Sequence, residues 1–239
     1  MNKKAVCLLS GGLDSSVCCF IAAQQDYDVY ALTFRYTQRH IKEIDCATSI
    51  AQAVGAKKHV IFDIDFSLIG DSSLLTYSKG EITNHDLSDI GKSIPSTYVP
   101  GRNTVFLSLA LSYAETVHAD AIFIGVNAID YSGYPDCRPE FIDAFQQMAN
   151  LSSKCAVKGK QIWIKAPLLY CKKSEIIRRG IELNVPFEYT WSCYKGLEKA
   201  CGCCDSCQLR LKGFIDAGHT DPLSYEKYPS WYSTFNSKK

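Results

Sequence analysis

The chain has 239 residues, of which 46% are hydrophobic and 21% are charged, a composition typical of a globular protein with one large or two small domains. Its formal net charge of +1 argues against a basic nucleic-acid-binding surface, so we expect no direct nucleic-acid partner. No apolar run approaches the roughly 20 residues of a membrane-spanning helix, and the N-terminal MNKK is not an apolar leader. We therefore expect a cytoplasmic protein without a membrane partner.

Strand-like and helix-like segments alternate along most of the chain. In chain order we predict a strand over 4–9, a helix over 14–25, a strand over 28–36, a helix over 41–55, a strand over 58–65, an irregular segment over 66–103, a helix over 103–119, a strand over 121–127, a helix over 139–153, a strand over 161–169 and a helix over 172–184. This alternation is typical of a parallel sheet with helices on both faces. We predict an α/β fold with a doubly wound parallel sheet in residues 1–186 and a small cysteine-rich C-terminal lobe in residues 187–239.

The first predicted strand runs directly into the sequence SGGLDSS, residues 10–16. The backbone N–H groups at the start of a helix lack partners, and the helix dipole is positive there. The two glycines allow the backbone to approach a bulky anion, and the serines add hydroxyl donors, so the stretch predicts a phosphate site. It lacks the lysine of a Walker A loop. The alternative is a tight turn followed by a helix that Asp14 caps.

The tail of the chain carries a second motif, SCYKGLEKACGCCDSC. Its spacing C-x7-C-x2-C-x2-C is typical of a closed four-thiolate zinc site, formed by Cys193, Cys201, Cys204 and Cys207. An iron–sulfur centre is the alternative, although ferredoxin runs usually end in Cys-Pro, and Gln208 follows here. Cys203 breaks the spacing, and we predict that it points away from the metal.

Two further segments offer polar side chains near the predicted site. The sequence GVNAIDYSGYPDCRPEF leaves the carboxyl end of a predicted strand, where doubly wound sheets bind their ligands. Its candidate substrate-binding residues are Asn127, Asp130, Tyr134, Asp136 and Arg138. An aspartate can accept from a guanine-like edge and an arginine can bind a carboxylate or phosphate, but such residues often only satisfy the turn.

The segment VPGRNTVF places Arg102 and Asn103 just before a predicted buried helix. These residues either cap that helix or face the nucleotide and the substrate. We nominate Arg102 for both substrate binding and stabilisation of charge on the phosphates.

The stretch SGGLDSS resembles the pyrophosphate loop, SGGxDS, of the ATP-pyrophosphatase (PP-loop) superfamily. That superfamily has an adenine nucleotide alpha hydrolase-like doubly wound sheet and usually cleaves ATP between the α- and β-phosphates. The resemblance implies that the pyrophosphate is wrapped by Ser10, Gly11, Gly12, Leu13, Asp14, Ser15 and Ser16, with Leu8 and Leu9 beside the nucleotide. It also implies that Asp14 is a catalytic residue, as a Mg²⁺ contact or a brace of the loop.

Taken together and in order, the four motifs resemble the 7-cyano-7-deazaguanine synthases. The resemblance implies an ATP- and Mg²⁺-dependent carbon–nitrogen ligase of queuosine (tRNA-modification) biosynthesis. Its substrates would be 7-carboxy-7-deazaguanine, ammonia and ATP, and the reaction would pass through adenylated intermediates to the nitrile. The resemblance also implies one structural Zn²⁺ per subunit, bound by the four cysteines, and a homodimer.

Three other functions share parts of this pattern. A tRNA-thiolating enzyme would share the loop, but it usually carries a basic RNA-binding domain. An amidotransferase-type synthetase would need a glutaminase domain, for which this chain has no room. A zinc-dependent nucleotide sensor would bind ATP without turnover, and it would not need a purine-recognition loop.

Overall fold

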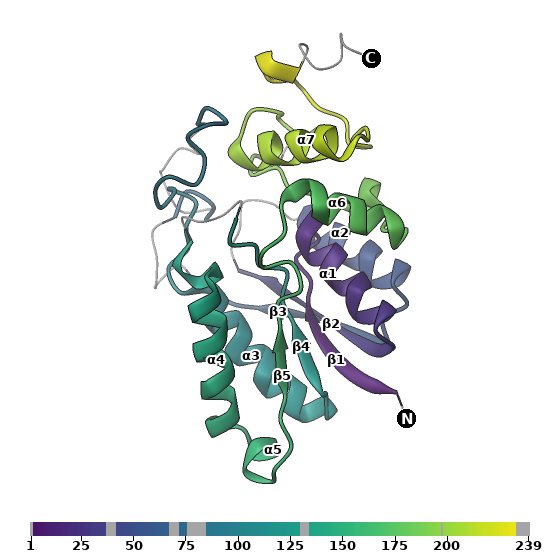
Figure 1. Ribbon diagram of the computed structural model, residues 1–239, viewed down its shortest axis with the longest axis vertical. Coiled ribbons are helices and arrows are strands. Elements are labelled where there is room, and N and C mark those ends of the chain that lie inside the picture. The colour runs from purple at the N-terminus through teal and green to yellow at the C-terminus, as the bar shows by residue number, and fades with distance from the viewer. Residues whose placement is uncertain are drawn as a thin grey trace.

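A five-stranded parallel sheet forms the centre of the molecule (Figure 1). The computed structural model describes residues 2–36, 42–66, 72–75, 85–129, 134–196 and 198–232. The strands are β1 (Lys3–Leu8), β2 (Tyr27–Arg35), β3 (Lys58–Asp63), β4 (Ala121–Phe123) and β5 (Trp163–Lys165), and they lie in the order β3-β2-β1-β4-β5. The predicted fold class is confirmed, although β4 and β5 are shorter than the predicted strands.

Helices cover both faces of this sheet, which confirms the doubly wound arrangement. The α-helices are α1 (Leu13–Gln24), α2 (Lys42–Ala53), α3 (Arg102–Val117), α4 (Pro139–Ser152), α5 (Lys154–Val157), α6 (Lys173–Glu182) and α7 (Asp205–Ala217), with short 3-10 helices η1 (Pro135–Cys137) and η2 (Phe187–Tyr189). Helices α1, α2 and α6 pack on one face, and α3 and α4 pack on the other. All five predicted helices are present.

The central strand β1 shows why its sequence is apolar throughout. Val6 and Leu8 pack into the core on the side of α3 and α4, whereas Ala5 and Cys7 pack into the core on the side of α1, α2 and α6. Successive side chains of a strand point to opposite faces, so a strand buried on both faces needs a continuous apolar run. The run Ala5–Leu9 meets that need.

The strand order reverses between β1 and β4, and this reversal positions the site. β1 pairs with β2 on one side and with β4 on the other, so the chain leaves β1 and β4 in different directions. Gly125, just after β4, packs against the start of α1. A Cβ atom on Gly125 would lie 2.8 Å from Ser15 Cα and 2.9 Å from the Ser15 backbone nitrogen. A glycine is therefore required for α1 to begin this close to β4.

We expect Gly125→Ala to lower the free energy of unfolding by roughly 1–3 kcal/mol, because the added methyl group would clash with the backbone at the start of α1, which can move only by disturbing the helix. Urea unfolding followed by circular dichroism measures the change. An unchanged unfolding midpoint and slope would contradict the prediction, since it would mean that the start of α1 moves away at no cost.

The C-terminal segment packs on the sheet domain through α7, a helix that the sequence analysis did not predict. α7 lies against α6 (Figure 1), where a Cβ atom on Gly213 would approach Lys173 Cγ to 2.4 Å. Phe214 joins the core beside Phe187, with ring centroids 5.3 Å apart. The buried face of α7 also carries Arg210 and Gln208, so buried polar side chains interrupt the hydrophobic periodicity that would have revealed the helix.

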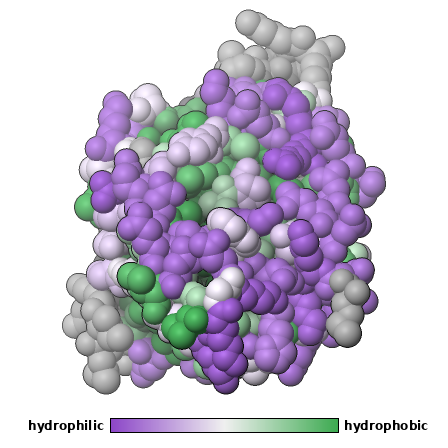
Figure 2. All heavy atoms as spheres, turned by 60° about the horizontal axis from the view of Figure 1, so that its bottom comes forward, coloured by the Kyte–Doolittle hydropathy of each residue, from purple (hydrophilic) through white to green (hydrophobic). Residues whose placement is uncertain are grey.

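The outer surface is mostly polar on the face that Figure 2 shows, with smaller groups of hydrophobic side chains between the polar ones. Among the helices in the described part of the chain, none has the length and apolar character needed to cross a membrane.

Candidate active site

A cavity of about 250 Å³ lies at the carboxyl ends of β1, β2 and β4. Its floor includes residues at the ends of these strands, and its walls include the first turns of α1, α2, α3 and α6. A further wall comes from the C-terminal segment, through Trp191, Ser192, Tyr194, Ser206 and Arg210. The predicted phosphate loop and the cysteine-rich tail therefore meet at one cavity.

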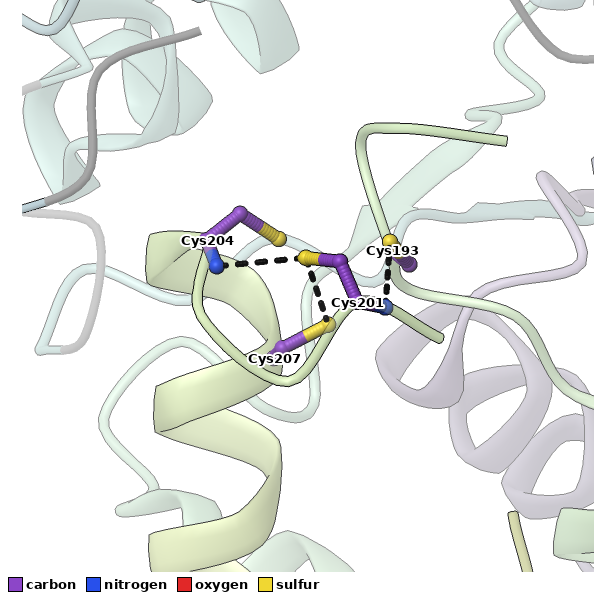
Figure 3. A group of neighbouring side chains, drawn as sticks. All are labelled: Cys193, Cys201, Cys204 and Cys207. Carbon is purple, nitrogen blue, oxygen red and sulfur yellow. Dashed lines mark hydrogen bonds between the residues drawn. The ribbon is translucent and has the colours of Figure 1, made fainter. Parts of the chain in front are cut away.

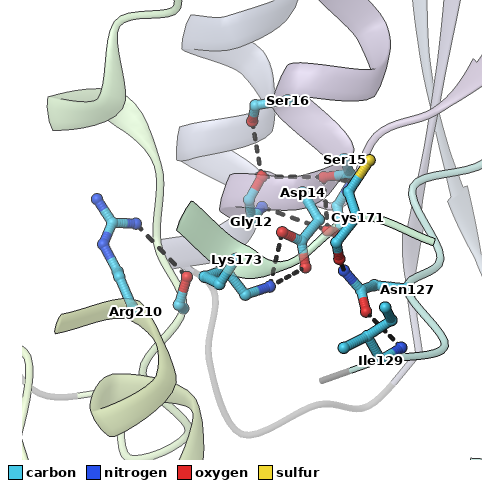
Figure 4. A network of polar contacts seen from close by, with 11 residues as sticks. Gly12, Asp14, Ser15, Ser16, Asn127, Ile129, Cys171, Lys173 and Arg210 are labelled. Carbon is cyan, nitrogen blue, oxygen red and sulfur yellow. Dashed lines mark hydrogen bonds and ion pairs between the residues drawn. The ribbon is translucent and has the colours of Figure 1, made fainter. Parts of the chain in front are cut away.

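The SGGLDSS loop is held by its own hydroxyl groups (Figure 4). The Ser10 backbone N–H donates to Ser15 Oγ at 3.2 Å, and the Ser16 hydroxyl donates to the Gly12 carbonyl at 2.7 Å. The Trp191 N–H donates to the Gly11 carbonyl at 2.8 Å, so the C-terminal segment also braces the loop. These contacts fix the loop in one shape ahead of ligand binding.

Gly11 is required by both its conformation and its surroundings. Its φ is +81°, and a Cβ atom there would lie 2.2 Å from the Glu43 carbonyl oxygen. Helix α1 begins at Leu13, its N-cap is Gly12, and no side chain caps it. The alternative in which Asp14 caps the helix is therefore wrong, since Asp14 lies inside the first turn.

Asp14 instead forms a largely buried ion pair with Lys173, the first residue of α6 (Figure 4). Lys173 Nζ lies 2.8 Å and 2.7 Å from the two carboxylate oxygens of Asp14, and the side chains are 8% and 17% exposed. Both residues line the cavity. The sequence analysis did not single out Lys173. Its place in the first turn of a helix that follows a predicted strand could have marked it as a candidate phosphate-binding residue.

Most predicted nucleotide-binding residues line the cavity. They are Leu8, Leu9, Ser10, Gly12, Leu13, Asp14 and Ser15. Gly11 and Ser16 do not line it: Gly11 packs against α2, and the Ser16 side chain is buried.

The predicted substrate-binding residues divide into three groups. Arg102, Asn127 and Tyr134 line the cavity. Asp136 and Arg138 do not: Asp136 is buried and accepts the Asn103 N–H at 2.9 Å, and Arg138 Nε donates to the Pro135 carbonyl at 3.2 Å. Asp130 lies outside the described residues.

The first turn of α3 settles the two alternatives for Arg102 and Asn103. The N-cap is Gly101, in the left-handed conformation, and no side chain caps the helix. Asn103 lines the cavity, and its Nδ2 donates to the Asp136 carbonyl at 3.0 Å. Arg102 faces the cavity and donates from Nη1 to the Tyr36 hydroxyl at 3.1 Å.

The electrostatics around Arg102 keep it charged. Burial by itself lowers the pKa of Arg102, but the neighbouring Tyr36, Tyr134 and Asp136 raise it above the ordinary value. Burial raises the pKa of Cys137 to about 12, so this cavity thiol stays protonated. The wall around Arg102 therefore presents one permanent positive charge.

The four predicted ligand cysteines lie together (Figure 3). The Sγ atoms of Cys193, Cys201, Cys204 and Cys207 are all within 4.8 Å of one another, and all four residues are buried. The Cys201 and Cys207 sulfurs are 3.9 Å apart, close to the separation of about 3.8 Å that tetrahedral Zn–S bonds of about 2.3 Å imply. Cys203 lies outside this group, as predicted, and its sulfur accepts from Lys195 Nζ at 3.6 Å.

This geometry fits a single metal ion with no open position. Cys204 is the N-cap residue of α7 and Cys207 lies in its first turn, whereas Cys193 stands between the cavity residues Ser192 and Tyr194. A metal ion at this point would therefore fix one wall of the cavity.

Comparisons with known proteins decide the family. The family model described as "Queuosine biosynthesis protein QueC" matches residues 4–218. The chain belongs to the QueC family. It is 51% identical over 233 residues to a 7-cyano-7-deazaguanine synthase of Thermoplasma volcanium, covering 98% of this chain and 95% of that protein. It is 52% identical over 229 residues to one of a Geobacter species (strain M21), covering 95% of this chain and all of that protein.

Solved structures support the fold of this QueC family chain. A 4-thiouridine synthetase in complex with RNA and ATP matches with a TM-score of 0.50 at 16% identity, over 99% of this chain and 50% of that one. The NMN synthetase of Francisella tularensis matches with a TM-score of 0.50 at 14% identity, over 98% of this chain and 82% of that one. At this level of identity the likeness extends to the fold only.

Proposed function

We propose that this chain is a 7-cyano-7-deazaguanine synthase, an ATP-dependent ligase that converts 7-carboxy-7-deazaguanine and ammonia to the nitrile. The observation that carries the proposal is a sequence identity of 51–52%, over almost the full length, to proteins of that name. The predicted phosphate loop, which lines a cavity large enough for small molecules, supports it. We further propose that the enzyme acts in the cytoplasm as a homodimer and binds no nucleic acid directly.

In this proposal the loop and the start of α1 hold the pyrophosphate of ATP. The unpartnered N–H groups of the first turn and the dipole of α1 attract the anion. Lys173 adds a positive charge to the same cavity, and Asp14 keeps that ammonium group in place. Asp14 also offers the carboxylate oxygen that Mg²⁺ prefers as a ligand. When bound, Mg²⁺ would neutralise the charge that develops on the phosphates.

The chemistry needs activation of a poor electrophile. The substrate carboxylate attacks the α-phosphorus of ATP, the bond to the pyrophosphate oxygen breaks, and the acyl adenylate forms. Ammonia attacks the acyl carbon, AMP leaves, and an amide remains. The amide oxygen then attacks the α-phosphorus of a second ATP and pyrophosphate leaves; loss of AMP and of the two protons on nitrogen gives the nitrile. No protein nucleophile is required. The chain positions the reactants, and Arg102, Asn127 and Tyr134 on the cavity wall are the proposed contacts to the deazaguanine.

We assign a structural role to the metal of the four-cysteine group, and we propose that the metal is zinc. The donor set is four sulfurs in a compact buried group, which suits Zn²⁺ and leaves no position for substrate. A four-iron cluster would hold its cysteine sulfurs farther apart than these. We propose one Zn²⁺ per subunit, bound by Cys193, Cys201, Cys204 and Cys207.

The direct test uses the purified full chain with ATP, Mg²⁺, ammonium and 7-carboxy-7-deazaguanine. We expect the nitrile in the mass spectrum, together with AMP and pyrophosphate, and none of these products when the deazaguanine is left out. Folded, metal-replete protein that forms no adenylate, amide or nitrile would overturn the substrate assignment. Sulfur transfer to tRNA in the same assay, with a sulfur donor present, would favour a thiolating enzyme instead.

A further inference from the structure

One wall of the cavity carries a carboxylate that the mechanism above does not use. Glu43 lies in the first turn of α2 and lines the cavity. Among the described residues, its carboxylate forms no hydrogen bond and no ion pair within 4.0 Å. Its backbone is fixed, because its carbonyl oxygen packs directly against Gly11 of the phosphate loop. Glu43 is therefore a positioned acceptor beside the nucleotide loop.

Arg102 faces the same space from α3. Its charge lowers the pKa of Glu43, but the two groups form no ion pair within 4.0 Å. The Arg102 guanidinium donates one N–H to the Tyr36 hydroxyl, and its other N–H groups form no hydrogen bond among the described residues. The cavity thus presents unused acceptors on Glu43 and unused donors on Arg102.

The surroundings of these two groups are aromatic. Phe34, Tyr36 and Phe106 line the cavity, and the ring centroids of Phe106 lie 4.1 Å from Phe34 and 5.5 Å from Tyr36. Such a wall suits a flat heterocycle. Asp136, one of the two aspartates that the sequence suggested for a guanine-like edge, accepts the backbone N–H of Asn103 at 2.9 Å, and the other, Asp130, lies outside the described residues. Among the described residues, two carboxylates line the cavity: Asp14, which is paired with Lys173, and Glu43.

Two ligands could use an unpaired carboxylate here: the ammonium ion, or the paired N–H and NH₂ groups of a guanine-type ring. Arg102 distinguishes them. The Arg102 guanidinium is close enough to Glu43 to lower its pKa, so it also repels a second cation bound in the same space. It does not repel the neutral N–H edge of a guanine-type ring. A carboxylate offers two acceptor oxygens, which match the two adjacent donor groups of that edge.

We propose that Glu43 is the specificity-determining residue that accepts hydrogen bonds from the ring N–H and the 2-amino group of the deazaguanine substrate. Arg102 retains donors for the oxygen atoms of the same substrate. The proposal rests on the proposed function, because it names the contact that selects a guanine-type ring in that reaction.

Burial raises the pKa of Glu43 to about 7, and the charge of Arg102 opposes the rise. Tyr36 and Cys46 also face this carboxylate, and the pKa of each is raised mainly by burial. The ionised form of this partly buried carboxylate is stabilised by a neutral ligand that donates hydrogen bonds to it.

The test compares two ligands on the full chain: 7-carboxy-7-deazaguanine, and the analogue in which hydrogen replaces the 2-amino group. Binding is measured by calorimetry in the presence of Mg²⁺ and a non-hydrolysable ATP analogue. We expect the wild type to prefer the guanine-type ligand by roughly 100-fold, because an unfilled buried acceptor penalises the analogue. Glu43→Gln is expected to reduce that preference to less than about tenfold, with unchanged affinity for the ATP analogue.

Two further variants sharpen the comparison. Asp45→Asn removes a negative charge from an exposed position on the same helix and is expected to keep the full preference. Glu43→Asp keeps the charge but shortens the side chain by one methylene, so we expect an intermediate preference. Glu43→Asp also serves as the test if Glu43→Gln unfolds.

The outcomes separate this proposal from the proposed function. If the wild type binds the guanine-type ligand and Glu43→Gln keeps its preference, the role of Glu43 is overturned and the proposed function stands. If Glu43→Gln raises only the KM for ammonium, the carboxylate binds the cation and the proposal is likewise overturned. A wild type that binds neither ligand would overturn both.

Discussion

Cys204→Ser is expected to release the bound metal and to lower the melting temperature by roughly 10 °C. Cys204 is fully buried and is the N-cap residue of α7, and its sulfur belongs to the compact group of four. A structural zinc site contributes its binding free energy to folding. Loss of one thiolate ligand should cost roughly 3–5 kcal/mol, at about 2–4 °C per kcal/mol for a chain of this size.

The same substitution should also reduce turnover, because the ligand-bearing segments form a cavity wall. Cys193 stands between Ser192 and Tyr194, and Ser206 lies between Cys204 and Cys207; all three of the non-cysteine residues line the cavity. Metal content from mass spectrometry and the melting temperature from calorimetry check the prediction. Calorimetry after treatment of the wild type with a chelator should reproduce the change.

Cys203→Ser is the matched control, since Cys203 lies next to Cys204 but outside the sulfur group. We expect it to keep one metal ion per chain and the wild-type melting temperature. If Cys204→Ser kept its fold and its stability but lost all turnover, a structural role for the metal would be wrong.

Asp14→Asn is expected to reduce kcat/KM by roughly 10³-fold and to lower the free energy of unfolding by roughly 3 kcal/mol. The amide removes the carboxylate that we propose as the Mg²⁺ contact. It also takes a negative charge away from the buried Lys173 ammonium group, which lies 2.7 Å from it. Removal of one partner of a buried ion pair is costly because the other charge stays in a poorly solvated place.

Steady-state kinetics with pyrophosphate release and urea unfolding measure these two effects. Asp143→Asn, at an exposed position on α4, is the control that changes the same charge without touching the cavity. In a double-mutant cycle with Lys173→Met, the loss of unfolding free energy in the double variant should be much smaller than the sum of the losses in the two single variants, because the pair acts as a unit. Wild-type kcat/KM in Asp14→Asn would contradict the assignment of Asp14 to the nucleotide site.

The unpredicted helix and the loop residues that do not line the cavity share a cause. The start of α7 carries two cysteines of the four-cysteine group. Its buried face carries Arg210, which is 2% exposed and bonds to Asp221 at 2.7 Å and to Thr190 at 2.7 Å. These partners are brought together by the packing of distant segments, and no pattern of neighbouring residues in the sequence predicts them. Asp136 and Arg138 looked equivalent to Asn127 in the sequence, but a short 3-10 helix turns them away from the cavity.

The sequence by itself determined the order of the five strands and of the helices α1, α2, α3, α4 and α6, the SGGLDSS loop and the cysteine group, because each depends on residues close together in the chain. Alternating apolar runs define the sheet and its helices, SGGLDSS carries its own turn and hydroxyls, and the cysteine spacing closes a single site. Only the tertiary structure decided which polar side chains share the cavity. Lys173 meets Asp14 across 159 positions of sequence, and Glu43 faces Arg102 from another helix. Such encounters are fixed by how helices pack around the strand ends, which no local pattern encodes.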